Sequence, residues 1–167
     1  MTRIYISLGS NVERERHIRA GLDGLYRLLG PLDVSRVFES EAVGFAGRPF
    51  YNLVVGADTD LPLAELSHAL RELEFAHGRE QHAKKFSPRT LDLDLLLFDD
   101  LVCDQPVNLP RGEILTNAFV LWPLAEIAPE CRHPISGESF AALWRAYDKR
   151  SQRLSPITFI WSPPSAQ

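Results

Sequence analysis

The sequence is poor in cysteine, with only Cys103 and Cys131 among its 167 residues. Two cysteines are too few for a disulfide framework, and neither stands in a Cys-x-x-Cys or histidine-rich setting that would indicate a metal site. The N-terminus lacks the apolar core of a signal peptide, and no apolar run approaches the length that spans a membrane. We therefore expect reduced thiols, a cytoplasmic protein and no membrane partner.

Positive charge is not in excess either, since 18 Lys and Arg face 22 Asp and Glu for a net charge of −4. This balance does not favour a nucleic-acid partner. Walker A and protein-kinase motifs are absent, so any phosphate transfer must use another scaffold. No internal repeat is present, and 45% of the residues are hydrophobic. We expect one domain over residues 1–161, a disordered tail at 162–167 and a monomer.

Hydrophobic spacing predicts the element order β-α-β-β-α-β, which is the split βαβ or ferredoxin-like pattern. Asn11 and Asp60 are expected as the N-caps of the first two helices, and Ser139 as the N-cap of the last one. The expected strands cover about 4–8, 33–38, 50–57, 91–98 and 157–161, and the expected helices lie within about 12–29, 61–77, 119–128 and 140–147.

Two aspartates, Asp92 and Asp94, alternate with Leu91, Leu93 and Leu95 in one extended segment. Such alternation places the acids on one face of a strand and the leucines on the other. Carboxylates at this spacing stand roughly 6–7 Å apart and repel each other by about 2–3 kcal/mol at an effective dielectric near 20. Mg²⁺ prefers carboxylate oxygens and shares its shell with substrate phosphates. By spacing alone, a metal site and a solvated strand edge fit equally well.

The segment 78–89, directly before this strand, carries four basic residues against the single acid Glu80. A charged loop is usually only a solvated loop, but this one adjoins a carboxylate pair. The combination favours a site for a nucleoside triphosphate with Mg²⁺. Long irregular connections often act as lids, so we expect this segment to become ordered over its ligand. The basic residues are Arg79, Lys84, Lys85 and Arg89.

The motif Pro-Arg-Thr-Leu-Asp-Leu-Asp at residues 88–94 resembles the signature of the 6-hydroxymethyl-7,8-dihydropterin pyrophosphokinase family. The resemblance implies an α/β (α+β) protein with three α/β/α layers and a ferredoxin-like βαββαβ core. It also implies transfer of the β,γ-diphosphate of ATP to the hydroxymethyl group of the dihydropterin, with release of AMP, in folate biosynthesis. Shorter supporting matches occur at residues 6–11, 41–45, 50–52, 78–79 and 119–129.

Carried over by position, the resemblance implies that Asp92 and Asp94 bind two Mg²⁺ ions that bridge the ATP phosphates. Arg89 matches the signature arginine, while Arg79 and Lys85 match basic phosphate contacts of the loop. We therefore take Arg79, Arg89, Asp92 and Asp94 as the candidate catalytic residues.

On the nucleotide side, the resemblance implies ATP contacts from Glu74, an acid before the loop, and from Leu95, an apolar residue. Arg111 and Gly112 stand where the family often has a His-Tyr pair. We hypothesise that Arg111 supplies the phosphate contact that histidine supplies elsewhere. Further departures from the family pattern are Gln81, Phe86 and Asn117.

For the pterin, Phe50 and Phe119 resemble two aromatic residues that sandwich the flat ring. Without the resemblance, each would be interpreted as a core phenylalanine. Asn52 resembles the amide that reads the pterin edge, because Asn offers both donors and an acceptor. Ser40 and Val43 fall where the family's loop supplies backbone and apolar contacts.

Two other classes of function stay open at this point. The altered nucleotide-side residues also fit a non-catalytic pterin- or nucleotide-binding paralogue, which would not release AMP. A metal-dependent phosphohydrolase built on the aspartate pair would release phosphate without a pterin acceptor. The hydrolase is harder to support, because no third acid can be placed and Phe50 and Phe119 are left unexplained.

Overall fold

The computed structural model describes residues 1–40, 49–77 and 90–164, and its strands join one sheet in which every pairing is antiparallel. The strands are β1 (Thr2–Ser10), β2 (Asp33–Val34), β3 (Val37–Ser40), β4 (Phe50–Thr59), β5 (Asp92–Phe98) and β6 (Leu154–Ile157). They follow the order β5-β1-β4-β3-β6, and β2 also pairs with β4. Strands β1 and β3 both run antiparallel to β4, so they are parallel to each other with β4 between them. This arrangement confirms the predicted split βαβ core.

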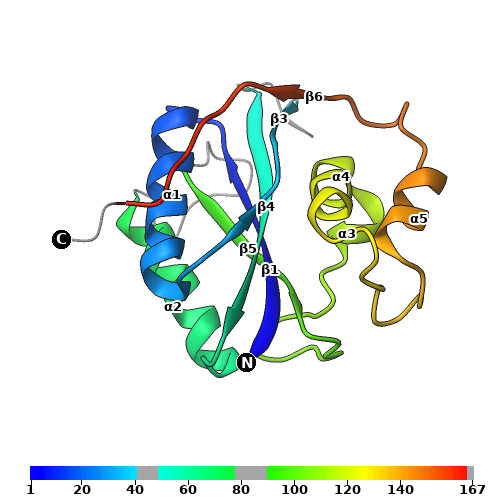
Figure 1. Ribbon diagram of the computed structural model, residues 1–167, viewed down its shortest axis with the longest axis horizontal. Helices are drawn as coiled ribbons and strands as arrows, with labels where there is room; N and C mark the ends of the chain where they lie inside the picture. Colours follow the sequence, from blue (N-terminus) through cyan, green and yellow to red (C-terminus); the bar gives the residue numbers. More distant parts are fainter. Residues whose placement is uncertain (41–48, 78–89, 165–167) are drawn as a thin grey trace.

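Helices cover both faces of the sheet (Figure 1). The helices are α1 (Arg14–Leu29), α2 (Leu63–Ala76), α3 (Glu113–Thr116), α4 (Ala118–Ile127) and α5 (Phe140–Ala146). α1 and α2 lie on one face, and α3, α4 and α5 lie on the other. The predicted three-layer α/β/α architecture is therefore confirmed.

Each face of the sheet has its own hydrophobic core. The first core joins α1 and α2 to the sheet through Ile4, Ile6, Leu8, Ile18, Leu22, Leu25, Leu53, Leu66, Leu70, Leu93 and Leu95. The second core joins the other helices to the opposite face through Tyr5, Val54, Leu96, Ile114, Leu121, Leu124 and Phe140. Because a core packs against each face of the central strands, the residues at the ends of those strands have a rigid support.

The starts of the first two helices differ from the prediction. The residue before α1 is Glu13, with a left-handed backbone (φ 40°), and it makes no side-chain cap; the expected cap Asn11 is buried two residues earlier. β1 runs as far as Ser10, so the chain needs the next residues to turn before a helix can begin. Pro62, rather than Asp60, precedes α2, and the Leu61 amide donates to the Thr59 hydroxyl instead. The third predicted cap is confirmed, because the Ser139 hydroxyl accepts a hydrogen bond from the Ala142 amide at 3.1 Å.

The limits of two predicted strands differ most from the structure. The strand expected over 33–38 is split into β2 and β3, because the Ser35 hydroxyl takes the hydrogen bond of the Val54 amide in place of a backbone carbonyl. The strand expected over 157–161 ends at Ile157, which already pairs with Val37, the first residue of β3. Beyond that point the chain crosses α1 (Figure 1). There the Trp161 indole donates a hydrogen bond to the Asp23 carboxylate.

Candidate active site

One row of the sheet brings an acid and an amide to the same place. Gly9 at the end of β1 pairs with Asp92 of β5 on one side and with Asn52 of β4 on the other. Residues directly opposite each other in antiparallel strands share a face. Asp92 and Asn52 therefore lie on the same face with only a glycine between them. A Cβ on Gly9 would stand 3.1 Å from Oδ1 of Asn52, so the glycine leaves room for the amide.

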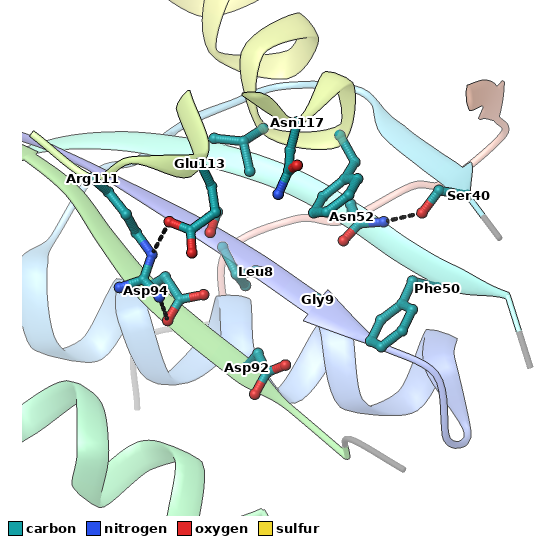
Figure 2. Close-up of a pocket in the computed structure, with 13 residues that line it drawn as sticks. Leu8, Gly9, Ser40, Phe50, Asn52, Asp92, Asp94, Arg111, Glu113 and Asn117 are labelled. Carbon is teal, nitrogen blue, oxygen red and sulfur yellow. Dashed lines mark hydrogen bonds and ion pairs between the residues drawn. The ribbon is translucent and has the colours of Figure 1, made fainter. Parts of the chain in front are cut away.

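The alternation predicted for the aspartate strand is confirmed. Leu93 and Leu95 are buried in the core against α1 and α2, whereas Asp92 and Asp94 are half-buried on the opposite face. Figure 2 shows both carboxylates projecting from β5 into the space beside β1. The strand then becomes wholly apolar, and Leu96 is completely buried in the second core.

A pocket of about 250 Å³ covers this part of the sheet, and we call it the sheet-face pocket. It is lined by Ser7, Leu8, Gly9, Ser40, Phe50, Asn52, Asp92, Asp94, Arg111, Glu113, Asn117, Phe119 and Val120. Phe50 comes from the start of β4 and Phe119 from the first turn of α4, so the two rings reach the pocket from the sheet and from the covering helix layer. Aromatic and acidic groups therefore line one cavity.

Asn52 is fixed within the sheet-face pocket. Its Nδ2 donates a 2.7 Å hydrogen bond to Oγ of Ser40 on β3, and both side chains are buried (Figure 2). This bond fixes the orientation of the amide. An oriented amide in a pocket can recognise a heterocycle edge that offers a donor and an acceptor side by side.

On the expectation from the family resemblance that this pocket binds a pterin, we predict that Ser40→Ala raises the KM for the pterin by about three- to tenfold, because the Asn52 amide loses the hydrogen bond that orients it. Steady-state kinetics with saturating ATP measures the change. The KM for ATP should stay within about twofold, since the residues expected to contact the nucleotide are untouched. An unchanged pterin KM would show that Asn52 does not depend on this bond.

A second pocket adjoins the first at the edge of the sheet, and we call it the edge pocket. It lies between α2 and β5 and is lined by Ser67, Leu70, Arg71, Glu74, Leu93, Asp94, Leu95, Val107 and Arg111. Glu74 is buried, and its Oε2 accepts a 2.9 Å hydrogen bond from the Leu93 amide. Among the described strands, β5 is the last on this side of the sheet, so Glu74 satisfies a backbone donor that a further strand would otherwise pair.

Asp94 and Arg111 line both pockets and mark their border. Nη2 of Arg111 lies 3.5 Å from Oδ1 of Asp94, and its Nε lies 2.9 Å from Oε2 of Glu113 (Figure 2). The two pockets thus meet at an ion-pair cluster.

The donor set suits a hard divalent cation. Asp92 and Asp94 offer carboxylate oxygens on one strand face, and both line the sheet-face pocket. Within the described ranges, no group of three or more His, Cys, Asp or Glu residues is placed to hold a metal ion. A two-carboxylate site fits Mg²⁺, which commonly takes one or two carboxylates and completes its shell with water and phosphate oxygens.

The residues expected from the sequence divide into three groups. Ser40, Phe50, Asn52, Asp92, Asp94, Arg111 and Phe119 line the sheet-face pocket, and Glu74 and Leu95 join Asp94 and Arg111 at the edge pocket. The predictions for Val43, Arg79, Lys85, Arg89 and the lid segment 78–89 lie outside the described residues.

Sequence reasoning missed two residues that matter in the site. Glu113 was not singled out, although the opposite charges of Arg111 and Glu113 two positions apart were a weak signal of pairing. Gly9 is likewise not singled out by the sequence pattern. Its role depends on which strands flank β1, and a single sequence does not show that.

These features define a class of protein: a ferredoxin-like α/β fold with a pocket that joins aromatic and acidic side chains on one face of the sheet. Residues 5–129 match the family model of 7,8-dihydro-6-hydroxymethylpterin-pyrophosphokinase (HPPK), and the chain belongs to this family. The family resemblance inferred from the motif at 88–94 is confirmed.

Two relatives agree with this membership, and a solved structure agrees with the fold. A 2-amino-4-hydroxy-6-hydroxymethyldihydropteridine pyrophosphokinase of Pseudomonas aeruginosa is 40% identical over 137 residues, which cover 79% of this chain and 84% of the relative. The folic acid synthesis protein fol1 of Pneumocystis carinii is 32% identical over 145 residues, covering 83% of this chain and 19% of that protein. The crystal structure of wild-type Plasmodium falciparum HPPK-DHPS matches 89% of this chain with a TM-score of 0.68 and 14% identity. The chain spans 45% of that larger protein, and at this identity the match supports the fold alone.

Proposed function

We propose that this protein transfers the β,γ-diphosphate of ATP to the hydroxymethyl group of 6-hydroxymethyl-7,8-dihydropterin, giving AMP and the pterin diphosphate for folate synthesis. The observation that carries the proposal is the sheet-face pocket, in which Phe50, Asn52 and Phe119 stand beside Asp92 and Asp94. A flat ring and a metal–phosphate group thus have adjacent places in one cavity. Family membership and the folic acid synthesis relative support the same reaction.

In this reaction the hydroxymethyl oxygen forms a bond to the β-phosphorus of ATP. The bond between the β-phosphorus and the oxygen that bridges to the α-phosphate breaks, and that oxygen leaves with AMP. The hydroxyl proton passes to solvent. Phosphoryl transfer of this kind depends on positioning and charge stabilisation more than on covalent catalysis by the protein.

The pterin side of the pocket provides positioning. Phe50 and Phe119 hold the ring by stacking and exclude water from its faces. Asn52, oriented by Ser40, selects the ring edge that carries adjacent donor and acceptor atoms. Val43 is proposed as an apolar contact to the same ring. The hydroxymethyl group is then directed toward the carboxylates of β5.

The carboxylate side of the pocket is the proposed metal site. Asp92 and Asp94 would hold two Mg²⁺ ions together with the ATP phosphates. Bound there, the ions supply neutralisation of the charge that develops on the β-phosphoryl group. The two carboxylates also lose their mutual repulsion when a cation lies between them.

The nucleotide itself is assigned to the edge pocket and its border. Leu95 offers an apolar surface, while Glu74 and Arg111 supply polar contacts. Arg79, Lys85 and Arg89 are proposed to contact the phosphates, and Arg79 and Arg89 to act in catalysis with Asp92 and Asp94. Guanidinium groups suit this task because they bind phosphate oxygens through paired hydrogen bonds.

The proposed partners are the two small-molecule substrates only, with the protein acting as a cytoplasmic monomer. In the part of the chain that the structure describes, no helix combines the length and apolar character needed to cross a membrane.

A second candidate function is the non-catalytic binding paralogue. It is motivated by Arg111 and Asn117, which line the sheet-face pocket in place of residues common in the family. The phosphohydrolase is a poorer candidate, because it gives no role to the aromatic half of the same pocket.

Product analysis separates these candidates. We expect protein, ATP, Mg²⁺ and hydroxymethyl-dihydropterin together to give AMP and the pterin diphosphate, resolved by anion-exchange chromatography. Omitting the pterin should abolish AMP formation, and ADP should not accumulate in either case. A protein that binds the pterin tightly but gives no turnover would be the non-catalytic paralogue. Release of phosphate without pterin would identify the hydrolase.

A further inference from the structure

Arg111 already places a positive charge at the carboxylate that is proposed to bind metal. Its Nη2 lies 3.5 Å from Oδ1 of Asp94, and its Nε lies 2.9 Å from Oε2 of Glu113. The guanidinium is therefore shared between two acids. Its side chain is 34% exposed and those of Asp94 and Glu113 are 38% and 43% exposed, so solvent weakens these ion pairs without abolishing them.

The position of Arg111 is fixed by its backbone. The Arg111 amide donates to the carbonyl of Leu96 on β5 at 3.1 Å, and its carbonyl accepts from the Ile114 amide at 3.2 Å. Glu113 is the first residue of α3, whose Ile114 is completely buried in the second core. The backbone of Arg111 is thus hydrogen-bonded to the same strand as Asp94, which keeps the guanidinium within reach of this carboxylate.

We propose that Arg111 is a built-in counter-ion of Asp94 that competes with the divalent metal, and that Glu113 holds Arg111 beside the site when the metal replaces it. The proposal rests on the proposed function in one respect, the assignment of Asp94 as a metal ligand. A monovalent guanidinium at 3.5 Å stabilises the carboxylate before substrate arrives. A divalent ion binds the same carboxylate more strongly once ATP phosphates complete its shell.

Glu113 determines where Arg111 lies after the metal has replaced it at Asp94. When metal takes Asp94, Arg111 keeps its closer partner, Glu113, and stays at the border of the sheet-face and edge pockets. A phosphate chain that runs from one pocket to the other passes this border. The same side chain then serves first as a substitute for the metal and afterwards as a contact to the nucleotide.

The test measures Mn²⁺ binding to the nucleotide-free full chain. The electron paramagnetic resonance signal of the unbound Mn²⁺ reports how much of the ion is free. Arg111→Gln should tighten Mn²⁺ binding by about three- to tenfold, because it removes the competing cation. Glu113→Gln should weaken binding by about two- to threefold, because Arg111 then pairs with Asp94 alone. In the double variant, the effect of Glu113→Gln should disappear, since Glu113 acts through Arg111.

Matched controls separate this role from simple charge effects. Arg71→Gln removes a positive charge from the lining of the edge pocket and should change the Mn²⁺ affinity by less than about twofold. An equal increase in Mn²⁺ affinity in Arg71→Gln and Arg111→Gln would overturn the counter-ion role. Unchanged Mn²⁺ affinity in Arg111→Gln would overturn it as well. Asp94→Asn tests the metal assignment itself and should abolish tight binding. Wild-type affinity in that variant would overturn both the metal site of the proposed function and the competition at Asp94.

Discussion

Replacement of Asp94 by alanine is expected to reduce the rate of diphosphate transfer by on the order of 10³-fold or more while the protein stays folded. The loss follows because one of the two carboxylates proposed to hold Mg²⁺ disappears, and with it much of the charge stabilisation of the β-phosphoryl group. Folding should be little affected, since the side chain is 38% exposed and its removal relieves repulsion from Asp92. Release of AMP measures the transfer rate, and urea-induced unfolding measures the stability of the fold.

Asp100→Ala is the matched control for this variant. Asp100 is an exposed acid just beyond the end of β5, so its removal deletes the same charge from the same segment of chain. We expect its turnover to stay within about twofold of the wild type. Normal turnover in Asp94→Ala would refute the metal assignment, and equal losses in both variants would show that only total charge matters.

Replacement of Phe119 by alanine is expected to raise the KM for the pterin by about 10- to 100-fold. Stacking of a heteroaromatic base on an aromatic side chain is worth about 1–3 kcal/mol, and each 1.4 kcal/mol is a factor of ten. The KM for ATP should change by less than about threefold, because Phe119 lines the sheet-face pocket and not the edge pocket. Initial rates with each substrate varied in turn give both constants.

Two variants control for simple loss of apolar area. Phe119→Leu keeps most of the apolar bulk but cannot stack. If stacking matters, its KM for the pterin should lie between those of the wild type and Phe119→Ala. Phe75→Ala removes a 39% exposed ring from α2 and should leave the pterin KM unchanged. If the KM for the pterin in Phe119→Ala equals the wild-type value, the pterin ring does not stack on Phe119 in this pocket.

The aspartate strand could be predicted from sequence because its signal is local. Alternation of Asp92 and Asp94 with leucines fixes which side chains share a face, whatever the strand pairs with. The order of helices and strands likewise followed from hydrophobic spacing and led to the correct core topology. Strand limits and helix caps were less accurate, because hydroxyl groups such as those of Ser35 and Thr59 took hydrogen bonds that propensity alone does not predict.

The composition of the pocket depended on information that no single segment holds. Phe50 and Phe119 have the pattern of core residues and were assigned only through the family resemblance. Gly9 lies between Asp92 and Asn52 because of strand order, which is a tertiary property. The pairing of Arg111 with Asp94 arises where the chain before α3 returns to β5. Long-range approaches of this kind leave no periodic trace in the sequence.

The most direct test of the account is a crystal structure of the protein with Mn²⁺, a non-hydrolysable ATP analogue and hydroxymethyl-dihydropterin. Anomalous scattering should locate Mn²⁺ on the carboxylates of Asp92 and Asp94, and the pterin ring should lie between Phe50 and Phe119 with its edge on the Asn52 amide. A structure with both ligands bound but no metal at these aspartates, or with the pterin in another place, would contradict it.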